Sequence, residues 1–151
     1  MNTHHPDQPD PTDIARFLAE DIGAGDLTAR ILSDSAIAAA TVVTRENMVL
    51  CGTDWFDAVF KQLDPTIHIE WQGKDGDAVK AGDLLCRLQG SARNLMTGER
   101  TALNLLQTLS GTATVSREYA RAVSGTGTRI LDTRKTLPGL RRAQKYAVRC
   151  G

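Results

Sequence analysis

A short strand, a polar loop and a helix follow one another at residues 129–148. Residues 129–131 form the predicted strand and residues 132–136 the loop. Pro138 is expected in the first helical turn, where its missing N–H is tolerated. This order is typical of one unit of a parallel β/α arrangement, which needs further parallel strands beside the first. We therefore expect the first strand–helix unit of a second, parallel β/α domain that this chain leaves incomplete.

The residues before this unit carry a mixture of helical and strand patterns. Thr12 is expected to cap a first helix, and Thr53 a second helix that stops before Pro65. The expected strands are 36–45, 67–71, 77–80 and 84–89, several of them bounded by glycine. Helices combined with these short strands predict an α+β unit.

A change of character at Asn94 suggests the domain organisation. We expect a helix over residues 95–109, a break or kink at Ser110-Gly111, and a second helix through Val115 and Tyr119. The predicted N-terminal domain, with its linking helix, therefore spans 12–110, and the start of the barrel domain spans 111–151. Residues 1–11 contain three prolines and no apolar stretch, and are expected to form a disordered tail.

Charge is balanced overall but unevenly distributed. The formal net charge is zero, so broad binding to nucleic acid is not expected, and no run of apolar residues is long enough to span a membrane. Residues 129–149 nevertheless carry a net charge of +6. That segment could attract a small anionic ligand, or it could be a solvated helix face. Three widely spaced cysteines predict neither a disulfide framework nor a CxxC metal knuckle, and favour the reducing cytoplasm.

The loop at residues 132–136 is the best candidate for chemistry. Arg134 offers a planar fork for carboxylate or phosphate, Lys135 a compact charge, and Thr133 a neutral donor. In β/α barrels, functional groups lie on loops after strands. The alternative is that Asp132 pairs with Arg134 or Lys135 and only braces the loop.

A carrier domain is a further alternative. Residues 76–88 (GDAVKAGDLLCRL) resemble the turn pattern of biotinyl and lipoyl domains. Those domains need a lysine soon afterwards to accept the cofactor, and no lysine occurs between Lys80 and Lys135. The glycines are therefore expected to serve tight turns.

Three segments together resemble the quinolinate phosphoribosyltransferase family, also called nicotinate-nucleotide pyrophosphorylase (carboxylating). They are EDIGAGDLT, GERTALNLLQTLSGTAT and ILDTRKTLPGLRRAQKYAVRCG, and the resemblance extends over residues 14–151. It implies an open-faced α/β sandwich joined to an α/β barrel. It also implies conversion of quinolinate and phosphoribosyl pyrophosphate to nicotinate mononucleotide, pyrophosphate and CO₂, with Mg²⁺, in cytoplasmic NAD biosynthesis.

The resemblance implies roles for four residues. Arg134 and Lys135 would be catalytic, and together with Thr133 they would contact substrate. Arg100, which follows Glu99 on the surface of the long helix, would reach the neighbouring site of a homodimer. The family's acidic residues for ribose and Mg²⁺ have no counterpart in these residues, so we expect no turnover from this chain alone. The alternative is a non-catalytic fragment that retains an anion-binding loop or a dimer surface.

Overall fold

The computed structural model describes residues 7–23, 32–33 and 35–151. The helices are α1 (Pro11–Ile22), α2 (Thr53–Leu63), α3 (Ala92–Ala122) and α4 (Arg141–Cys150). The strands are β1 (Ile37–Val43), β2 (Met48–Val49), β3 (His68–Trp71), β4 (Ala78–Val79) and β5 (Leu84–Ser91). None of the described helices is long and apolar enough to cross a membrane. The second helix and most of the strands therefore lie where the sequence predicts them.

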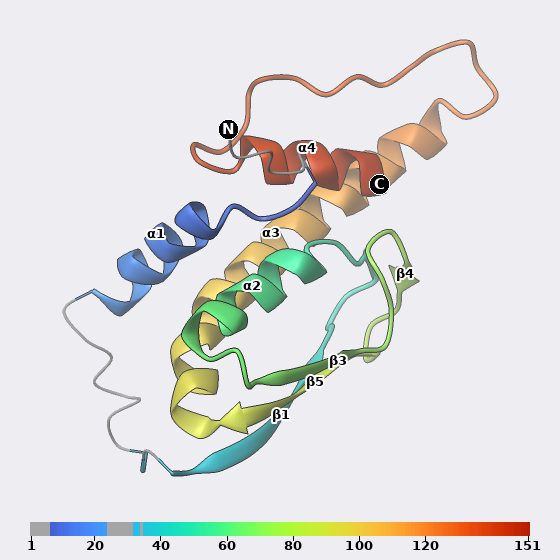
Figure 1. The fold of residues 1–151 in the computed structure, drawn as a ribbon. Coiled ribbons are helices and arrows are strands. Elements are labelled where there is room, and N and C mark those ends of the chain that lie inside the picture. Colours follow the sequence, from blue (N-terminus) through green and yellow to red (C-terminus); the bar gives the residue numbers. More distant parts are fainter. Residues whose placement is uncertain (1–6, 24–31, 34) are drawn as a thin grey trace.

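A three-stranded antiparallel sheet has β5 in its centre, with β1 on one side and β3 on the other (Figure 1). Thr41 of β1 pairs with Arg87, and Glu70 of β3 pairs with the same residue. The register of β1 shifts after Val42, which is typical of a β-bulge. The short strands β2 and β4 form a separate antiparallel ribbon.

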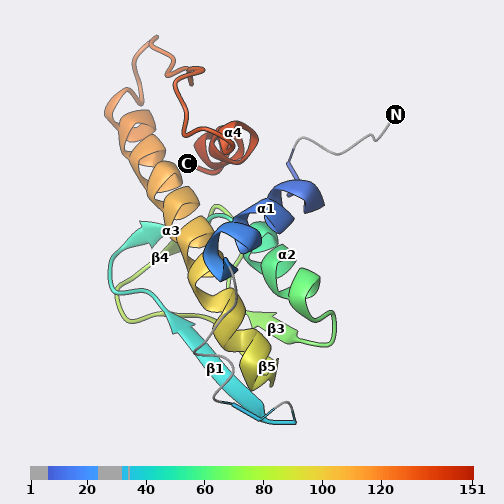
Figure 2. The same ribbon diagram turned by 90° about the vertical axis from the view of Figure 1, so that its left-hand side faces the viewer.

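Helices α2 and α3 lie against one side of this sheet (Figure 2). Leu88 of β5 is buried, whereas the neighbouring Arg87 and Gln89 are exposed, as expected when only one face is covered. Phe56 of α2 is almost fully buried and contacts the edge of Trp71 on β3, with ring centroids 5.2 Å apart. The layer of helices on one face of the sheet confirms the predicted α+β domain.

Helix α3 is continuous over 31 residues, so the predicted break at Ser110-Gly111 is wrong. Ser110 lies in the interior, where its hydroxyl bonds to the backbone of Cys51. A glycine inside a helix costs about 1 kcal/mol relative to alanine. The buried neighbours Leu109 and Ala113 offset that small cost, because they pack in the core on either side of Gly111.

The predicted strand at residues 129–131 is also not formed. These residues lie in a long connection between α3 and α4, and Leu131 is 80% exposed. A strand requires a hydrogen-bonded neighbour, and no described strand lies beside this segment. The following helix begins at Arg141 rather than near Pro138, because Gly139 adopts a positive φ of 81° that interrupts a helix. The barrel is thus represented by one helix, α4, packed on α3.

The described part of the predicted tail is anchored. Helix α1 begins at Pro11, and its cap is Asp10 rather than Thr12: an Asp10 carboxylate oxygen accepts a hydrogen bond of 2.9 Å from the Thr12 amide. Asp7 forms an ion pair with Arg149 of α4. The tail prediction is therefore wrong for residues 7–11, while residues 1–6 lie outside the described residues, as does most of the EDIGAGDLT segment.

Candidate functional site

The basic loop, residues 129–136, is held against α4 at its two ends. The Lys145 ammonium donates to the Asp132 carboxylate at 2.6 Å. Just beyond the loop, the Leu137 amide donates to the side-chain oxygen of Gln144 at 2.8 Å. The Gln144 nitrogen in turn donates to the Thr112 hydroxyl of α3 at 3.3 Å. Helix α4 therefore sets the position of the loop, and the predicted pairing of Asp132 with Arg134 or Lys135 is replaced by pairing with Lys145.

The three predicted substrate-contacting residues of the loop all face solvent. Thr133 accepts a hydrogen bond of 3.1 Å from the Lys135 amide, and the Arg134 carbonyl accepts one from the Thr136 amide. These bonds use the Thr133 hydroxyl and the backbone, not the charged groups. Among the described residues, neither Arg134 nor Lys135 forms an ion pair. Their charges are therefore accessible to an anion.

The cations of α4 behave differently, because aspartates neutralise three of them. Arg149 pairs with Asp7, Arg142 with Asp10 at 3.9 Å, and Lys145 with Asp132. The positive charge of residues 129–149 is consequently concentrated at the loop and at the start of α4. The N-terminal end of a helix adds positive potential of its own. The predicted attraction for small anions is thus focused at this end of α4.

Arg100 lies on α3, far from the basic loop of the same chain. Its exposed side chain pairs with Asp21 of α1 at 3.1 Å. The connection after α3 leads back to the start of α4 (Figure 1), where Leu137 bonds to Gln144 and Gln144 bonds to Thr112 of α3. Thr112 follows Arg100 by about 12 residues on α3, which corresponds to about 18 Å along the helix axis. One chain therefore does not bring all four predicted residues together.

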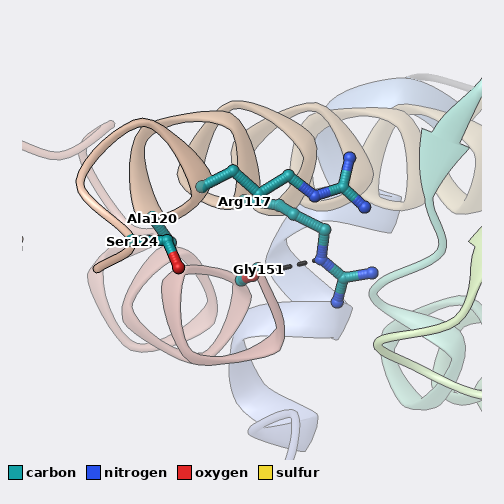
Figure 3. Close-up of a pocket in the computed structure, with 5 residues that line it drawn as sticks. Arg117, Ala120, Ser124 and Gly151 are labelled. Atoms are coloured by element: carbon teal, nitrogen blue, oxygen red, sulfur yellow. Dashed lines mark hydrogen bonds between the residues drawn. The ribbon is translucent and has the colours of Figure 1, made fainter.

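A shallow hollow of about 370 Å³ lies between the last turns of α3 and the end of α4 (Figure 3). Its lining residues are Arg117, Ala120, Arg121, Ser124 and Gly151. Arg117 donates to the carbonyl oxygens of Gly76, Cys150 and Gly151 at 2.8–3.2 Å. Arginine near a helix C-terminus satisfies its free carbonyl groups. Arg117 therefore has a structural role that the sequence alone did not reveal.

The described residues of the basic loop do not fit a magnesium site. Mg²⁺ prefers several oxygen ligands in octahedral geometry. The loop supplies a single carboxylate, Asp132, and that carboxylate already binds Lys145. The basic loop therefore does not supply the ligands of a magnesium ion.

An open sheet covered by helices, joined through one long helix to a second unit with a basic loop, defines an α+β domain coupled to the beginning of a second domain. The model of the quinolinate phosphoribosyl transferase N-terminal domain matches residues 26–110, and the model of the C-terminal domain of that family matches residues 112–151. The chain belongs to the quinolinate phosphoribosyl transferase family. The boundary between the two matches falls inside the continuous helix α3.

Individual relatives agree with this assignment. The chain is 41% identical over 138 residues to a probable nicotinate-nucleotide pyrophosphorylase (carboxylating) of Synechocystis, covering 91% of the chain and 47% of that protein. A Mycobacterium leprae relative is 42% identical, with 91% and 50% covered. The nicotinate-nucleotide pyrophosphorylase structure from Francisella tularensis matches with a TM-score of 0.87 and 45% identity, covering 99% of the chain and 55% of that structure. The chain spans about half the length of the curated relatives it matches.

Proposed function

We propose that this chain provides part of the substrate site of a quinolinate phosphoribosyltransferase. The enzyme would transfer the phosphoribosyl group of phosphoribosyl pyrophosphate to quinolinate and release pyrophosphate and CO₂, giving nicotinate mononucleotide for NAD biosynthesis. The observation that carries the proposal is the pair of unneutralised cations, Arg134 and Lys135, on a loop held in place by α4. The reaction is the one named by the relatives, nicotinate-nucleotide pyrophosphorylases (carboxylating).

Like charges must come together in this reaction, which explains the cations. Quinolinate carries two carboxylates, and phosphoribosyl pyrophosphate carries several negative charges. Fixed positive groups offset their repulsion and hold both molecules in a reactive orientation. Arg134 would hold a carboxylate of quinolinate through two parallel N–H donors, because guanidinium geometry matches a carboxylate. Lys135 would stabilise carboxylate or phosphate charge, and the Thr133 hydroxyl would orient the bound anion.

The same charges suit the chemical step. The pyridine nitrogen would attack the anomeric carbon of the ribose as the bond to pyrophosphate breaks. Its new positive charge would accept the electron pair left when the adjacent carboxylate departs as CO₂. A proton from solvent would then replace that carboxylate on the ring. The residues of this chain would act by binding and orientation.

Arg100 would complete the site of a second subunit in a homodimer. Its ion pair with Asp21 is exposed, and exposed ion pairs contribute only about 0–1 kcal/mol. Exchange of Asp21 for a substrate carboxylate would therefore cost little. Because Arg100 lies about 18 Å along α3 from Thr112, the residue beside which the basic loop ends, a contribution to the partner's site is the arrangement that uses all four residues.

A chimera tests the proposal. Residues 1–151 would replace the matching half of the Francisella tularensis protein, and nicotinate mononucleotide formation would be measured with both substrates and Mg²⁺. We expect turnover by the chimera and none by the 151-residue chain alone. Circular dichroism and size measurements show whether the chimera is folded. A folded chimera that binds neither substrate would contradict the proposal.

The second candidate is a non-catalytic fragment with an anion-binding loop. Exposure of Thr133, Arg134 and Lys135, none of which lines the hollow beside α3, favours this reading for the chain by itself. Quinolinate binding by the isolated chain, combined with an inactive but folded chimera, would support this alternative.

A further inference from the structure

Two cysteines and an aspartate from distant parts of the sequence meet beneath α4. Cys51 follows β2 and is fully buried, Asp75 lies between β3 and β4, and Cys150 is the last residue of α4. Their two sulfur atoms and one carboxylate oxygen all lie within 4.8 Å of one another. The proposed substrate chemistry uses none of the three. We propose that Cys51, Asp75 and Cys150 form a binding site for Zn²⁺ that fastens α4 to the N-terminal domain.

The donor set matches the chemistry of zinc. Zn²⁺ binds thiolate sulfur at about 2.3 Å and carboxylate oxygen at about 2.0–2.2 Å in tetrahedral geometry. Those bond lengths place neighbouring ligand atoms about 3.6–3.8 Å apart. The observed limit of 4.8 Å therefore requires movements of about 1 Å or less on metal binding. Two sulfur ligands also disfavour Mg²⁺ and Ca²⁺, which prefer oxygen.

Hydrogen bonds already orient the carboxylate. One oxygen of Asp75 accepts from the Thr53 amide at 3.1 Å, and the other accepts from the Gly52 amide and the Tyr146 hydroxyl, each at 2.9 Å. Carboxylates that ligate metals are commonly held in this way by groups around them. The first oxygen has accepted only one bond in the described structure, so it retains a lone pair for a metal ion.

Two thiolates and one carboxylate would offset the charge of a bound Zn²⁺. Binding replaces two S–H protons by two sulfur–zinc bonds, and both protons pass to the solvent. Water would occupy the fourth position, reached from the side of the half-buried Cys150.

Such a site would join the segment before α2, the loop between β3 and β4, and the end of α4. Cys51 and Asp75 lie at the start of α2, and Cys150 ends the helix that positions the basic loop. Arg117 already binds the carbonyl of Cys150 and that of Gly76 beside Asp75. Zinc would strengthen the same junction, and the proposal does not depend on which substrate the basic loop binds.

Cobalt spectroscopy on the 151-residue chain tests the site, with Zn²⁺ as competitor. Thiolate ligation of Co²⁺ produces a sulfur-to-metal charge-transfer band in the near ultraviolet, and Zn²⁺ should abolish it. We expect one equivalent of metal and release of about two protons per Zn²⁺ at pH 7. Loss of a group that only hydrogen-bonds to a metal ligand typically weakens metal binding about 10–100-fold, so Cys150→Ala, which removes a ligand, should weaken it at least about 100-fold. The matched control is Cys86→Ala, because Cys86 is buried on β5 outside the cluster, and it should retain the band.

A measurement on the wild-type chain covers the case in which Cys150→Ala does not fold. Zn²⁺ should protect Cys150 from alkylation by iodoacetamide, as read by mass spectrometry. Binding of cobalt without the charge-transfer band, a band that survives in folded Cys150→Ala, or alkylation of Cys150 that is unaffected by Zn²⁺ would each overturn the proposal.

Discussion

Tyr146 of α4 donates a hydrogen bond of 2.9 Å to Asp75, the carboxylate that also caps the start of α2. The same tyrosine ring packs on Trp55 of α2, with centroids 5.2 Å apart. Helix α4 is therefore joined to the N-terminal domain by a polar and an aromatic contact at one residue. Since α4 holds the basic loop, this junction links the stability of the first domain to the position of the candidate site.

Replacing Tyr146 by phenylalanine should weaken that junction. The ring contact with Trp55 is kept, and the bond to a charged acceptor is lost, so we expect a destabilisation of about 1–2 kcal/mol. Urea unfolding measures the change. The control is Tyr119→Phe, because Tyr119 is exposed on α3 and should change stability by less than about 0.5 kcal/mol. Equal effects of the two variants would contradict the role of Tyr146.

The contribution of Tyr146 to the free energy of unfolding should also depend on pH, and it should decrease at high pH. Burial and the hydrogen bond to Asp75 raise the pKa of its hydroxyl above the ordinary value of 10.0. A raised pKa in the folded state stabilises the protein fully below the unfolded value and loses this effect as the pH rises above it. The stability difference between wild type and Tyr146→Phe should therefore be constant from pH 7 to about 10 and shrink above that. A stability difference that already shrinks between pH 7 and 9 would contradict the raised pKa of Tyr146.

Gly111→Ala distinguishes a continuous α3 from a broken one. An added Cβ at Gly111 meets no atom within 4 Å, so alanine should stabilise a continuous helix by about 0.5–1 kcal/mol. The contrasting site in the same helix is Gly98, where a Cβ would lie 2.7 Å from the Phe60 ring. Gly98→Ala should destabilise by about 1–3 kcal/mol through overpacking. Thermal unfolding of both variants checks the pair; destabilisation by Gly111→Ala would favour a break at that position.

Ser110→Ala should lower the free energy of unfolding strongly, although it removes only one oxygen atom. The Ser110 hydroxyl accepts from the Cys51 amide at 3.0 Å and donates to the Cys51 carbonyl at 3.1 Å, in the buried core. Alanine would leave both backbone groups unpaired, at a cost of about 2–4 kcal/mol. The matched variant is Ser116→Ala, because the Ser116 hydroxyl only bonds to Thr112 within the helix. Its effect on urea unfolding should stay within about 0.5 kcal/mol, and a similar loss in both variants would be inconsistent with this account.

The sequence predicted those parts of the fold that depend on local signals. The helix that starts at Thr53 and ends before Pro65 has an apolar stripe and a stop signal, and β3 has alternating burial. The break at Ser110-Gly111 was wrong because the partner that satisfies Ser110 is Cys51, far away in the sequence. The strand at residues 129–131 was wrong because strands depend on neighbours, and local pattern does not show whether neighbours exist.

The candidate site shows the same division between local and distant information. The composition of the basic loop predicted Arg134 and Lys135 as groups that contact an anion, whereas the structure leaves both side chains exposed to solvent. The pairing of Asp132 with Lys145 and the neutralisation of α4 by Asp7 and Asp10 were not predicted, because they join residues that only the tertiary fold brings together. The roles of Arg134, Lys135 and Arg100 in substrate binding stay predictions from the family resemblance.

Quinolinate affinity of the chimera with Arg134→Ala tests the central claim most directly. Isothermal titration calorimetry should show binding at least about tenfold weaker than in the unmodified chimera, because hydrogen bonds to a charged group typically contribute about 1.5–3 kcal/mol. Arg129→Ala, which removes a cation from the same loop outside the predicted contact set, should bind quinolinate within about twofold of the unmodified chimera. Unchanged quinolinate affinity in folded Arg134→Ala would contradict the account.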